Sequence, residues 1–588
     1  MSFVLPIESV ITQLGYSTSN SLIRSAQFHE AALPTHAKKI LFELKPYAAY
    51  IIDDMPFVVF YDSIMSDDES MKTISKSIWN AQIPIAIFCD QNTVKIYNGV
   101  SLNMKDYTIK QVQEYSVSEC SAKSDFSFWN IADPLFWEKY SNKYADERLN
   151  KYLLDNISYL TNELKKTYRI SFATKLVLRL IFIRYLIDRG VDLAYKGFSS
   201  DITASKVEFL RIVKDKQLLY DLFSYLKTKF NGNLFELNDE VSCPELMPEV
   251  FTLLADFMSG NIQLCSGQMS LFSLYDFNII PVELISNIYE ILLGKEIQDK
   301  DNAFYTPNYL VEYILDRTVS QTLKRKAEFT ILDPACGSGV FLVDSFRRIV
   351  EQNLNGTQYC EDDALLAELL QKNIFGIDIN DEAIDVTIFS LYLTVLDYKD
   401  PKTLSEFELP NLKGKNLFVA DFFEESVLKT FSSLNLHFDF IIGNPPWGSV
   451  KSGLHLNYCK EKGYSQMQQN NEISRSFIFR AKDFCDQNTI CTFVLHSKLL
   501  YNQKQPAIRF RKHLLENTKL ISIVEMSSVR KLVFENAKAP AIILSFMYSQ
   551  QNNLDNKFWY TSFKPNVFFR LFNILAAEKN DVKLVSQR

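Results

Sequence analysis

Four apolar runs in the second half of the chain each end in a polar residue, and this pattern limits the possible fold more than any other feature. The runs are residues 330–332, 374–377, 417–419 and 438–442, and the polar residues are Asp333, Asp378, Asp421 and Asn444. Helical patterns separate the runs, which predicts an α/β fold with a mostly parallel sheet. Because parallel strands end at one edge of a sheet, we expect the four polar residues to line one site.

The rest of the chain divides into segments of different pattern. Residues 1–130 favour a small α/β lobe, with a helix over 8–14 that ends at Gly15. The strands predicted in this lobe are 39–44, 48–52, 57–61, 85–89 and 94–97. Residues 131–296 show helical spacing, above all over 149–164 and 173–189, with Gly190 as a candidate C-cap. Residues 297–550 hold the sheet, with further strands at 489–495, 520–525 and 541–548, and 551–588 form a C-terminal extension.

Composition narrows the class of protein. Of the 588 residues, 47% are hydrophobic and 23% charged, as in globular chains of several domains. Nine Cys without a C-x-x-C pair and six His predict neither a disulfide framework nor a zinc site, so we expect no metal. The N-terminus lacks a signal-peptide pattern, and Arg179 and Arg184 interrupt the most apolar stretch. We therefore expect a cytoplasmic protein without a membrane partner.

Charge is distributed unevenly along the chain. The net charge is −7, but residues 447–588 carry 21 Lys and Arg against 10 Asp and Glu. The remainder carries 42 basic and 60 acidic residues. This asymmetry favours a polyanionic partner for the C-terminal quarter, the alternative being an ordinary basic lobe on an acidic protein.

The turn after the first run has the composition of a ligand-binding loop. Its residues are Asp333, Pro334, Ala335, Cys336, Gly337, Ser338 and Gly339. Glycines let a ligand approach the backbone where a Cβ would clash. The spacing matches neither G-x-G-x-x-G nor the Walker A motif, so we expect no pyrophosphate site and no ATP-driven translocation. An Asp in this loop suits a cationic or hydroxyl-rich ligand.

The next two acidic residues suit a nucleoside. Asp378 follows the second run, where Rossmann-like sheets commonly bind ribose hydroxyls. The long gap between Asp333 and Asp378 predicts an inserted loop and helix over 351–372. Asp421 follows the third run beside Phe422, so a carboxylate could accept from an adenine amine while a ring stacks on the base.

The fourth run leads directly into Asn444-Pro445-Pro446-Trp447. Two prolines stiffen the turn and remove two N–H donors, so carbonyl groups are presented as acceptors. Asn444 adds a side-chain acceptor, and Trp447 offers a flat stacking face. An exocyclic amine held there would have both hydrogens accepted and its lone pair aimed at an electrophile.

Four segments of this region resemble the motifs of N6-adenine DNA methyltransferases of restriction–modification systems. They are Phe304-Tyr305-Thr306-Pro307, DPACGSG, GIDIN and NPPW, and they follow one another in the order of the gamma class. The likeness spans about 297–548 and implies a Rossmann-like class I methyltransferase sheet, S-adenosylmethionine as cofactor and double-stranded DNA as partner. It also implies that the target adenine is flipped out of the duplex.

The resemblance assigns a role to each motif residue. It places Tyr305, Thr306 and Pro307 in the cofactor pocket, and Asp333, Pro334, Ala335, Cys336, Gly337 and Gly339 against the methionine part. Asp378 would hold the ribose, Ile379 would lie against the adenine, and Asp421 next to Phe422 would accept from the adenine amine. Asn444 and the carbonyl of Pro445 would bind the target amine, with Pro446 stiffening the turn and Trp447 stacking on the base.

The first lobe resembles the nuclease-like domains of combined restriction–methylation enzymes, but the catalytic positions differ. The expected acidic residue falls at Tyr47 or Ala48, and the expected E-x-K falls within residues 60–63. Glu43-Leu44-Lys45 has that spacing on the predicted strand before. We expect a degenerate lobe that does not cut, followed by a helical connector over 131–296.

The chain ends about 40 residues after the last predicted strand of the methyltransferase sheet, where a target recognition domain usually begins in this class. We therefore expect either a fragment or a separate specificity subunit. Two alternatives remain open: a methyltransferase that acts on RNA or protein glutamine, and a non-catalytic DNA-binding scaffold of a phage-defence complex.

Overall fold

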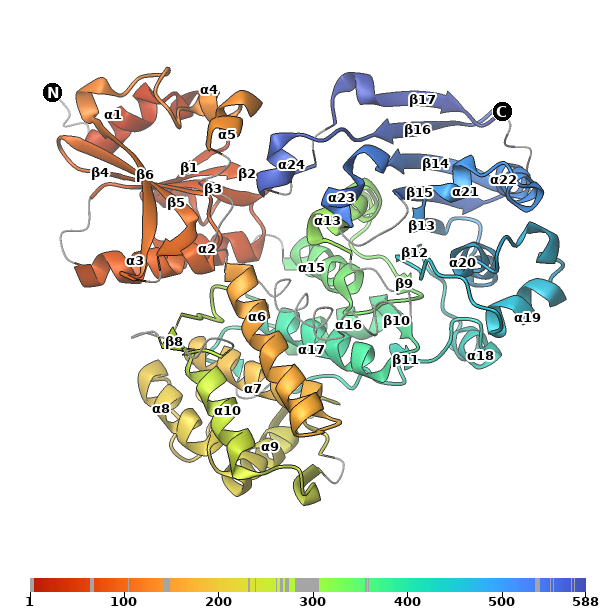
Figure 1. The fold of residues 1–588 in the computed structure, drawn as a ribbon, viewed down its shortest axis with the longest axis horizontal. Helices are drawn as coiled ribbons and strands as arrows, with labels where there is room; N and C mark the ends of the chain where they lie inside the picture. Colours follow the sequence, from red (N-terminus) through yellow and green to blue (C-terminus); the bar gives the residue numbers. More distant parts are fainter. Residues whose placement is uncertain are drawn as a thin grey trace.

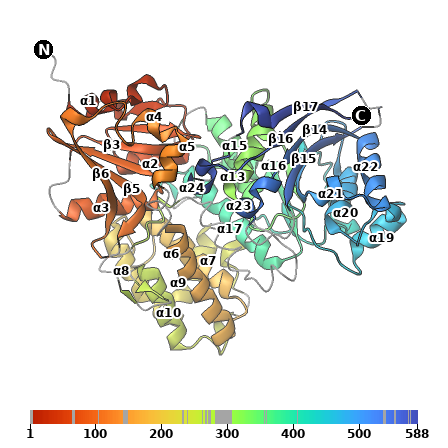
Figure 2. The same ribbon diagram turned by 45° about the horizontal axis from the view of Figure 1, so that its top comes forward.

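The protein is a mixed α/β molecule with two mixed sheets, and Figure 1 shows the sheets side by side with a group of helices below them. Figure 2 shows the same arrangement from a second direction. The structure is a computed structural model. It describes residues 5–63, 68–103, 105–140, 149–230, 233–237, 240–260, 262–264, 268–269, 274–280, 306–354, 357, 359–404, 407–534, 540–549, 551, 553, 555–572, 574–575 and 577–588.

The N-terminal sheet has six strands in sequence order, and helices cover both of its faces. Its strands are β1 (Leu22–Arg24), β2 (Ala48–Ile52), β3 (Met55–Tyr61), β4 (Ile85–Cys89), β5 (Thr93–Asn103) and β6 (Thr108–Ser116). Helices α1 (Pro6–Gln13), α4 (Phe128–Ile131) and α5 (Pro134–Tyr140) lie on one face, and α2 (Thr35–Leu44) and α3 (Asp68–Asn80) on the other. Only β3 and β4 pair in parallel. The predictions for 8–14, 48–52, 57–61, 85–89 and 94–97 are confirmed.

The strand predicted over 39–44 is wrong, because these residues belong to helix α2. Ala37, Ile40, Leu41 and Leu44 are buried, which is the i, i+3, i+4, i+7 spacing of one helix face. Glu43-Leu44-Lys45 therefore lies at the end of a helix, with Glu43 exposed, and not on a strand of the sheet.

A group of helices lies below the two sheets (Figure 1), and the described part of 131–296 is mostly helical, as its spacing predicts. Its helices are α6 (Leu149–Asn162), α7 (Ala173–Asp188), α8 (Ile202–Val213), α9 (Lys216–Phe230) and α10 (Pro248–Ser259). Helix α7 is buried along nearly its whole length, which its almost uniformly apolar sequence requires. A short hairpin, β7 (Ile262–Gln263) and β8 (Gln268–Met269), follows α10. Gly190 terminates the α7 segment with φ +71°, as its candidate C-cap role predicts.

The C-terminal sheet has nine strands in the order β11-β10-β9-β12-β13-β15-β14-β16-β17. They are β9 (Ile331–Asp333), β10 (Ile374–Asp378), β11 (Leu417–Val419), β12 (Phe440–Gly443), β13 (Ile490–His496), β14 (Thr518–Glu525), β15 (Ala541–Tyr548), β16 (Lys557–Ser562) and β17 (Val582–Ser586). The seven strands predicted in this region are confirmed. The first five pair in parallel, and β15 lies antiparallel between β13 and β14. The strand order turns back between β9 and β12, a position where sheets of this kind bind ligands.

Helices cover both faces of this sheet. On one face lie α13 (Asn308–Arg317), α14 (Val319–Leu323), α15 (Val340–Leu354), α16 (Asp363–Asn373) and α17 (Asp381–Asp397). On the other lie α18 (Glu425–Ser433), α19 (Leu454–Glu461), α20 (Ile473–Ala481), α21 (Lys498–Tyr501) and α22 (Gln505–Asn517). The remaining helices are α23 (Arg530–Val533) and α24 (Val567–Phe572). Helix α16 is the inserted helix that the long gap before Asp378 predicts.

The C-terminal extension continues the sheet, although no strand was predicted within residues 551–588. Strand β16 pairs in parallel with β14, and β17 pairs antiparallel with β16. The sheet is mixed: five of its eight strand pairings are parallel and three are antiparallel. Helix α24 packs Val567 and Leu571 into the core of the N-terminal sheet, so the end of the chain also contacts the first lobe. Within the described residues, no helix is both long and apolar enough to cross a membrane.

Candidate functional site

The loop between β9 and α15 is shaped by left-handed glycines and by hydrogen bonds to β10. Gly337 and Gly339 have φ of +54° and +82°, a region that favours glycine. The Cys336 amide donates to the carbonyl of Ile377 at 2.9 Å, and the Gly337 amide donates to Asp378 Oδ2 at 3.0 Å. A Cβ on Gly339 would lie 2.6 Å from Thr387 Cγ2 on α17. The loop is therefore fixed against both β10 and α17. Pro334, Cys336 and Ser338 are buried, and Ala335 is half-buried.

Asp333, at the end of β9, is a buried acid. Its Oδ1 accepts from the Ala335 amide at 3.1 Å. The pKa of Asp333 is raised to about 8, mainly by burial and also by the nearby carboxylate of Asp378, while the hydrogen bond from the Ala335 amide lowers it in part. A Cβ on Gly443 would lie 2.5 Å from Asp333 Oδ1, so the carboxyl group occupies the space above the end of β12. Such an acid would be ionised most readily beside a cationic ligand.

Asp378 and Ile379 follow β10 at the same edge of the sheet. Asp378 Oδ1 accepts from the Asn380 amide at 2.9 Å, while its Oδ2 binds the glycine loop. Ile379 is 66% exposed, which is unusual for a large aliphatic side chain. Asn380 caps α17 by accepting from the Glu382 amide at 2.9 Å. The polar loop, the acid and the exposed apolar side chain together form a surface suited to a nucleoside.

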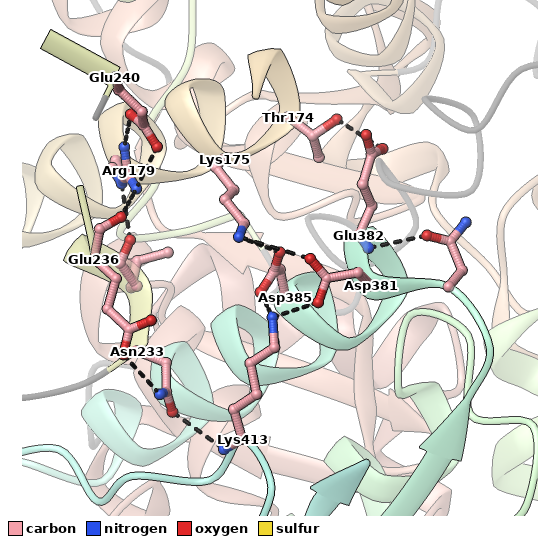
Figure 3. A network of polar contacts seen from close by, with 12 residues as sticks. Thr174, Lys175, Arg179, Asn233, Glu236, Glu240, Asp381, Glu382, Asp385 and Lys413 are labelled. Atoms are coloured by element: carbon pink, nitrogen blue, oxygen red, sulfur yellow. Dashed lines mark hydrogen bonds and ion pairs between the residues drawn. The ribbon is translucent and has the colours of Figure 1, made fainter. Parts of the chain in front are cut away.

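Helix α17 begins at this surface, and Figure 3 shows the contacts that hold its first turns. Lys175 Nζ lies 3.0 Å from Asp385 Oδ2, and Lys413 Nζ lies 3.0 Å from Asp385 Oδ1 and also pairs with Asp381. Thr174 Oγ1 donates to Glu382 at 3.1 Å. Farther along α17, Thr387 Oγ1 donates to the carbonyl of Gly337 at 2.8 Å. The helical group thus supports the glycine loop through α17.

Asp421 and Phe422 follow β11, but their side chains lie in different surroundings. Asp421 is half-buried, and its Oδ1 accepts from the Phe423 amide at 2.9 Å. The Phe422 ring is 2% exposed and stacks on Phe477 and Phe484, with centroids 5.1 and 4.9 Å apart. Its ring is therefore part of the core in this structure, whereas the neighbouring carboxylate reaches the surface.

Asn444, Pro445, Pro446 and Trp447 follow β12, beside the loop that carries Asp333. Pro445 is buried, and the other three are half-buried. Trp447 Nε1 donates to Asn444 Oδ1 at 3.0 Å and to the carbonyl of Val494 on β13 at 3.2 Å. Asn444 Nδ2 donates to Thr306 Oγ1 at 3.1 Å. The four predicted strand-end residues thus lie on four neighbouring strands.

Two aromatic side chains beside Trp447 were not singled out from the sequence. The Phe534 ring lies 5.2 Å from the Trp447 ring at 71°, and the His496 ring lies 6.4 Å away at 77°. Burial lowers the pKa of His496 to about 4, so its ring is neutral at pH 7. Phe534 lies a few residues before β15 in the sequence. An aromatic residue shortly before an apolar strand is the sequence feature that could have marked Phe534 as a candidate site residue.

Thr306 is buried and Pro307, which is half-buried, precedes α13, so both lie near Asn444. Tyr305 lies outside the described residues. No cluster of three or more His, Cys, Asp or Glu side chains that could hold a metal occurs in the described part of the chain.

Parts of the chain are similar to known restriction-modification proteins. Residues 372–534 match the family described as Eco57I restriction-modification methylase. The type II restriction enzyme and methyltransferase RM.Eco57I of Escherichia coli is 24% identical over 400 residues, which is 59% of this chain and 38% of that protein. The adenine-specific methyltransferase PglX of Streptomyces coelicolor is 33% identical over 124 residues, covering 19% of this chain and 10% of PglX.

A solved structure of the type IIL restriction-modification enzyme MmeI in complex with DNA is similar over 69% of this chain and 58% of that one, with 15% identity and a TM-score of 0.49. The chain spans under two fifths of the length of RM.Eco57I. The match of residues 372–534 to this methylase family and the likeness to RM.Eco57I relate the chain to combined restriction and modification enzymes.

Proposed function

We propose that this chain is a DNA adenine-N6 methyltransferase of a restriction–modification system. The observation that carries the proposal is the placement of Asp333, Asp378, Asp421 and Asn444 at the ends of β9, β10, β11 and β12, which are adjacent in the sheet. A Rossmann-like class I methyltransferase would use these four positions for its cofactor and its target. The match of residues 372–534 to a methylase family supports the same assignment.

The residues of this edge fit S-adenosylmethionine, which bears an ammonium and a sulfonium charge. Buried Asp333 and the 335–339 loop would hold its methionine part, since a cation favours the ionised carboxyl. Asp378 would accept from the ribose hydroxyls, exposed Ile379 would lie against the adenine, and Asp421 would accept from its amine. When bound, the cofactor supplies an electrophilic methyl group. Tyr305, Thr306 and Pro307 stay part of the proposed pocket wall.

The residues after β12 would hold the target amine. The Asn444 side-chain oxygen and the Pro445 carbonyl would each accept one of its hydrogens, and Trp447 and Phe534 would enclose the base. No general base is required, because the amine loses its proton to water after the transfer. Orientation and fixed dipoles would provide most of the rate.

Three further proposals concern the rest of the chain. The chain would consist of a nuclease-like lobe (1–130), a helical connector (131–296), the methyltransferase domain (297–550) and a C-terminal extension (551–588). The lobe would not cut DNA, because Tyr47 stands where an acid is expected and donates to Glu8 at 2.9 Å. A separate specificity subunit would provide site recognition, while basic residues after Trp447 face double-stranded DNA.

Nucleoside mass spectrometry tests the function directly. Methylation-free DNA incubated with the chain and S-adenosylmethionine should gain N6-methyladenine, and Asn444→Ala should remove the product while cofactor binding by calorimetry persists. Asn488→Ala, an exposed position before β13, is the matched control. Wild-type turnover in Asn444→Ala would refute the role of Asn444. Methylation of RNA or protein glutamine instead of DNA would show that the chain is a methyltransferase with another acceptor. If the chain does not bind S-adenosylmethionine, the proposed catalytic activity is refuted.

A further inference from the structure

The side-chain amide of Asn444 is held from two directions by groups that are far apart in the sequence. Asn444 Nδ2 donates to Thr306 Oγ1 at 3.1 Å, across 138 positions of sequence. On the other side, Asn444 Oδ1 accepts from Trp447 Nε1 at 3.0 Å. The same indole N–H also reaches the carbonyl of Val494 at 3.2 Å, so β13 fixes the ring edge as well.

The side-chain amide of asparagine can be turned over with little change of shape, which exchanges its oxygen and its nitrogen. Only one of the two orientations presents the oxygen to the proposed target amine. In the proposed reaction the target amine needs an acceptor, and an NH2 group in its place would repel it. A threonine hydroxyl both donates and accepts, so it is compatible with either orientation. An indole N–H only donates. Trp447 is therefore the partner that distinguishes the two orientations.

We propose that Trp447 fixes the catalytic orientation of Asn444 through its indole N–H, and that Thr306 is a positioning residue that holds the amide nitrogen. The inference rests on the proposed function and adds to it. It gives Thr306 a role on the target side of the site, and it gives Trp447 a second role besides offering a ring face. A carbonyl oxygen has two lone pairs, so Asn444 Oδ1 can accept from Trp447 and from the target amine together.

Thr306 and Trp447 are themselves held in place by their surroundings. Thr306 is 4% exposed, directly before Pro307 and α13, whose first turn fixes the backbone there. The Trp447 ring meets the Phe534 ring edge at 5.2 Å, which restricts its rotation. A phenylalanine or tyrosine at position 447 would supply a stacking ring but no N–H at the indole position. The tryptophan therefore provides a donor that phenylalanine lacks and that tyrosine would carry at a different position.

The experiment compares four variants. Trp447→Phe keeps a ring and loses the donor, and Thr306→Val keeps the shape and loses the hydroxyl. Each should lower kcat about tenfold, as the loss of one hydrogen bond would, with the KM for DNA and the Kd for S-adenosylmethionine within about threefold of wild type. Thr306→Ser, which restores a hydroxyl, should recover most of the kcat. The double variant Trp447→Phe/Thr306→Val should lose more than either single change.

A second readout does not depend on turnover. The chain has five Trp, so the indole N–H signals of a 15N-Trp sample are few, and the signal missing in Trp447→Phe identifies Trp447. Asn444→Ala should shift that signal upfield, because one of the two acceptors is lost.

The outcomes separate the two proposals. An unshifted Trp447 signal, or wild-type kcat in Trp447→Phe, overturns the positioning role and leaves the methyltransferase proposal standing. Loss of kcat in Thr306→Ser equal to that in Thr306→Val overturns the role of the hydroxyl. If the wild-type chain methylates no acceptor and does not bind S-adenosylmethionine, the proposed function fails, and the indole signal alone decides whether Trp447 holds Asn444.

Discussion

At the scale of single residues, the contact between Asp333 and Gly443 joins the proposed cofactor side of the site to the proposed target side. The carboxyl group lies where any side chain at position 443 would lie, 2.5 Å from an ideal Cβ. A side chain at position 443 would therefore require the Asp333 carboxyl group or the end of β12 to shift. The cost of this arrangement is a buried acid, whose pKa is raised to about 8 by burial.

Asp333→Asn should change how stability depends on pH. The pKa of Asp333 is about 8 in the folded chain and near 4 when unfolded, so the folded state binds the extra proton between these values. Wild-type stability therefore falls as pH rises from about 4 to 8, and Asn removes this loss. The melting temperature of the variant, relative to wild type, should rise between pH 5 and 8 without cofactor. Asp221→Asn, an exposed site on α9, should show no trend. Parallel profiles for wild type and Asp333→Asn would contradict the assignment.

The strand-end residues were predictable because each polar residue follows an apolar run within two positions, which is a local signal. The contact of Thr306 with Asn444 was not, since it depends on how α13 packs against the sheet. The core position of Phe422 was not predictable either. Phe422 and Phe423 are equally apolar, and only the packing of Phe477 and Phe484 decides where the ring lies.

At the scale of elements, short apolar runs were the main source of error. Residues 39–44 contain enough apolar residues for a strand, but Ala37 completes a helical face that includes Ile40, Leu41 and Leu44. Strand β16 was missed because the last residues were interpreted as the start of another domain. The long strands of the C-terminal sheet were predictable, since they are apolar on both faces and bounded by turn residues.

Lys175→Met tests whether α7 supports the site through α17. The change leaves Asp385, whose side chain is 11% exposed, with Lys413 as its charged partner in this network. Lys175 is itself partly exposed, so we expect a stability loss of about 1–2 kcal/mol, less than for a fully buried pair. Because α17 contacts Gly337, the Kd for S-adenosylmethionine should rise about threefold to tenfold.

The matched control for this change is Lys512→Met, which removes an exposed i, i+4 pair with Glu516 on α22. It should alter neither quantity, because such surface pairs contribute little. Denaturant unfolding and calorimetry measure the two effects. A Lys175→Met protein that binds cofactor like wild type would show that α17 is positioned by its sheet contacts alone.

At the scale of the whole molecule, α17 spans the distance between the site and the first lobe. Its first turn lies beside Asp378, and its last residue, Asp397, is bound by all three parts of the chain. Lys39 of α2 lies 3.1 Å from Asp397, Tyr185 of α7 donates to it at 2.5 Å, and Arg347 of α15 lies 3.5 Å away. One hydrophobic core also continues from α2 and α3 through the helical group to α15 and α17. The lobes are therefore packed as one body and not merely linked.

Asp397→Asn should weaken this junction. Burial alone would raise the pKa of Asp397, but the charges of Lys39, Arg189 and Arg347 outweigh burial and hold it below its ordinary value. The ionised carboxylate thus stabilises the fold above pH 4, and this contribution is lost as the pH falls below 4. At pH 7 we expect a loss of about 3 kcal/mol or more, because buried cations lose their partner. The difference between wild type and variant should shrink in acid.

Unfolding by urea at several pH values measures this loss, and limited proteolysis measures release of the N-terminal lobe. Arg211→Gln, which removes a mostly exposed pair on α8, is the control and should resemble wild type in both assays. If the junction couples the lobes, Asp397→Asn should speed cleavage between them. It should also weaken cofactor binding, because a change at the last residue of α17 would then reach its first turn beside Asp378. If cleavage speeds up and cofactor binding is unchanged, α17 does not transmit the state of the first lobe. The N-terminal lobe would then be a structural neighbour of the proposed site and not a regulator of it.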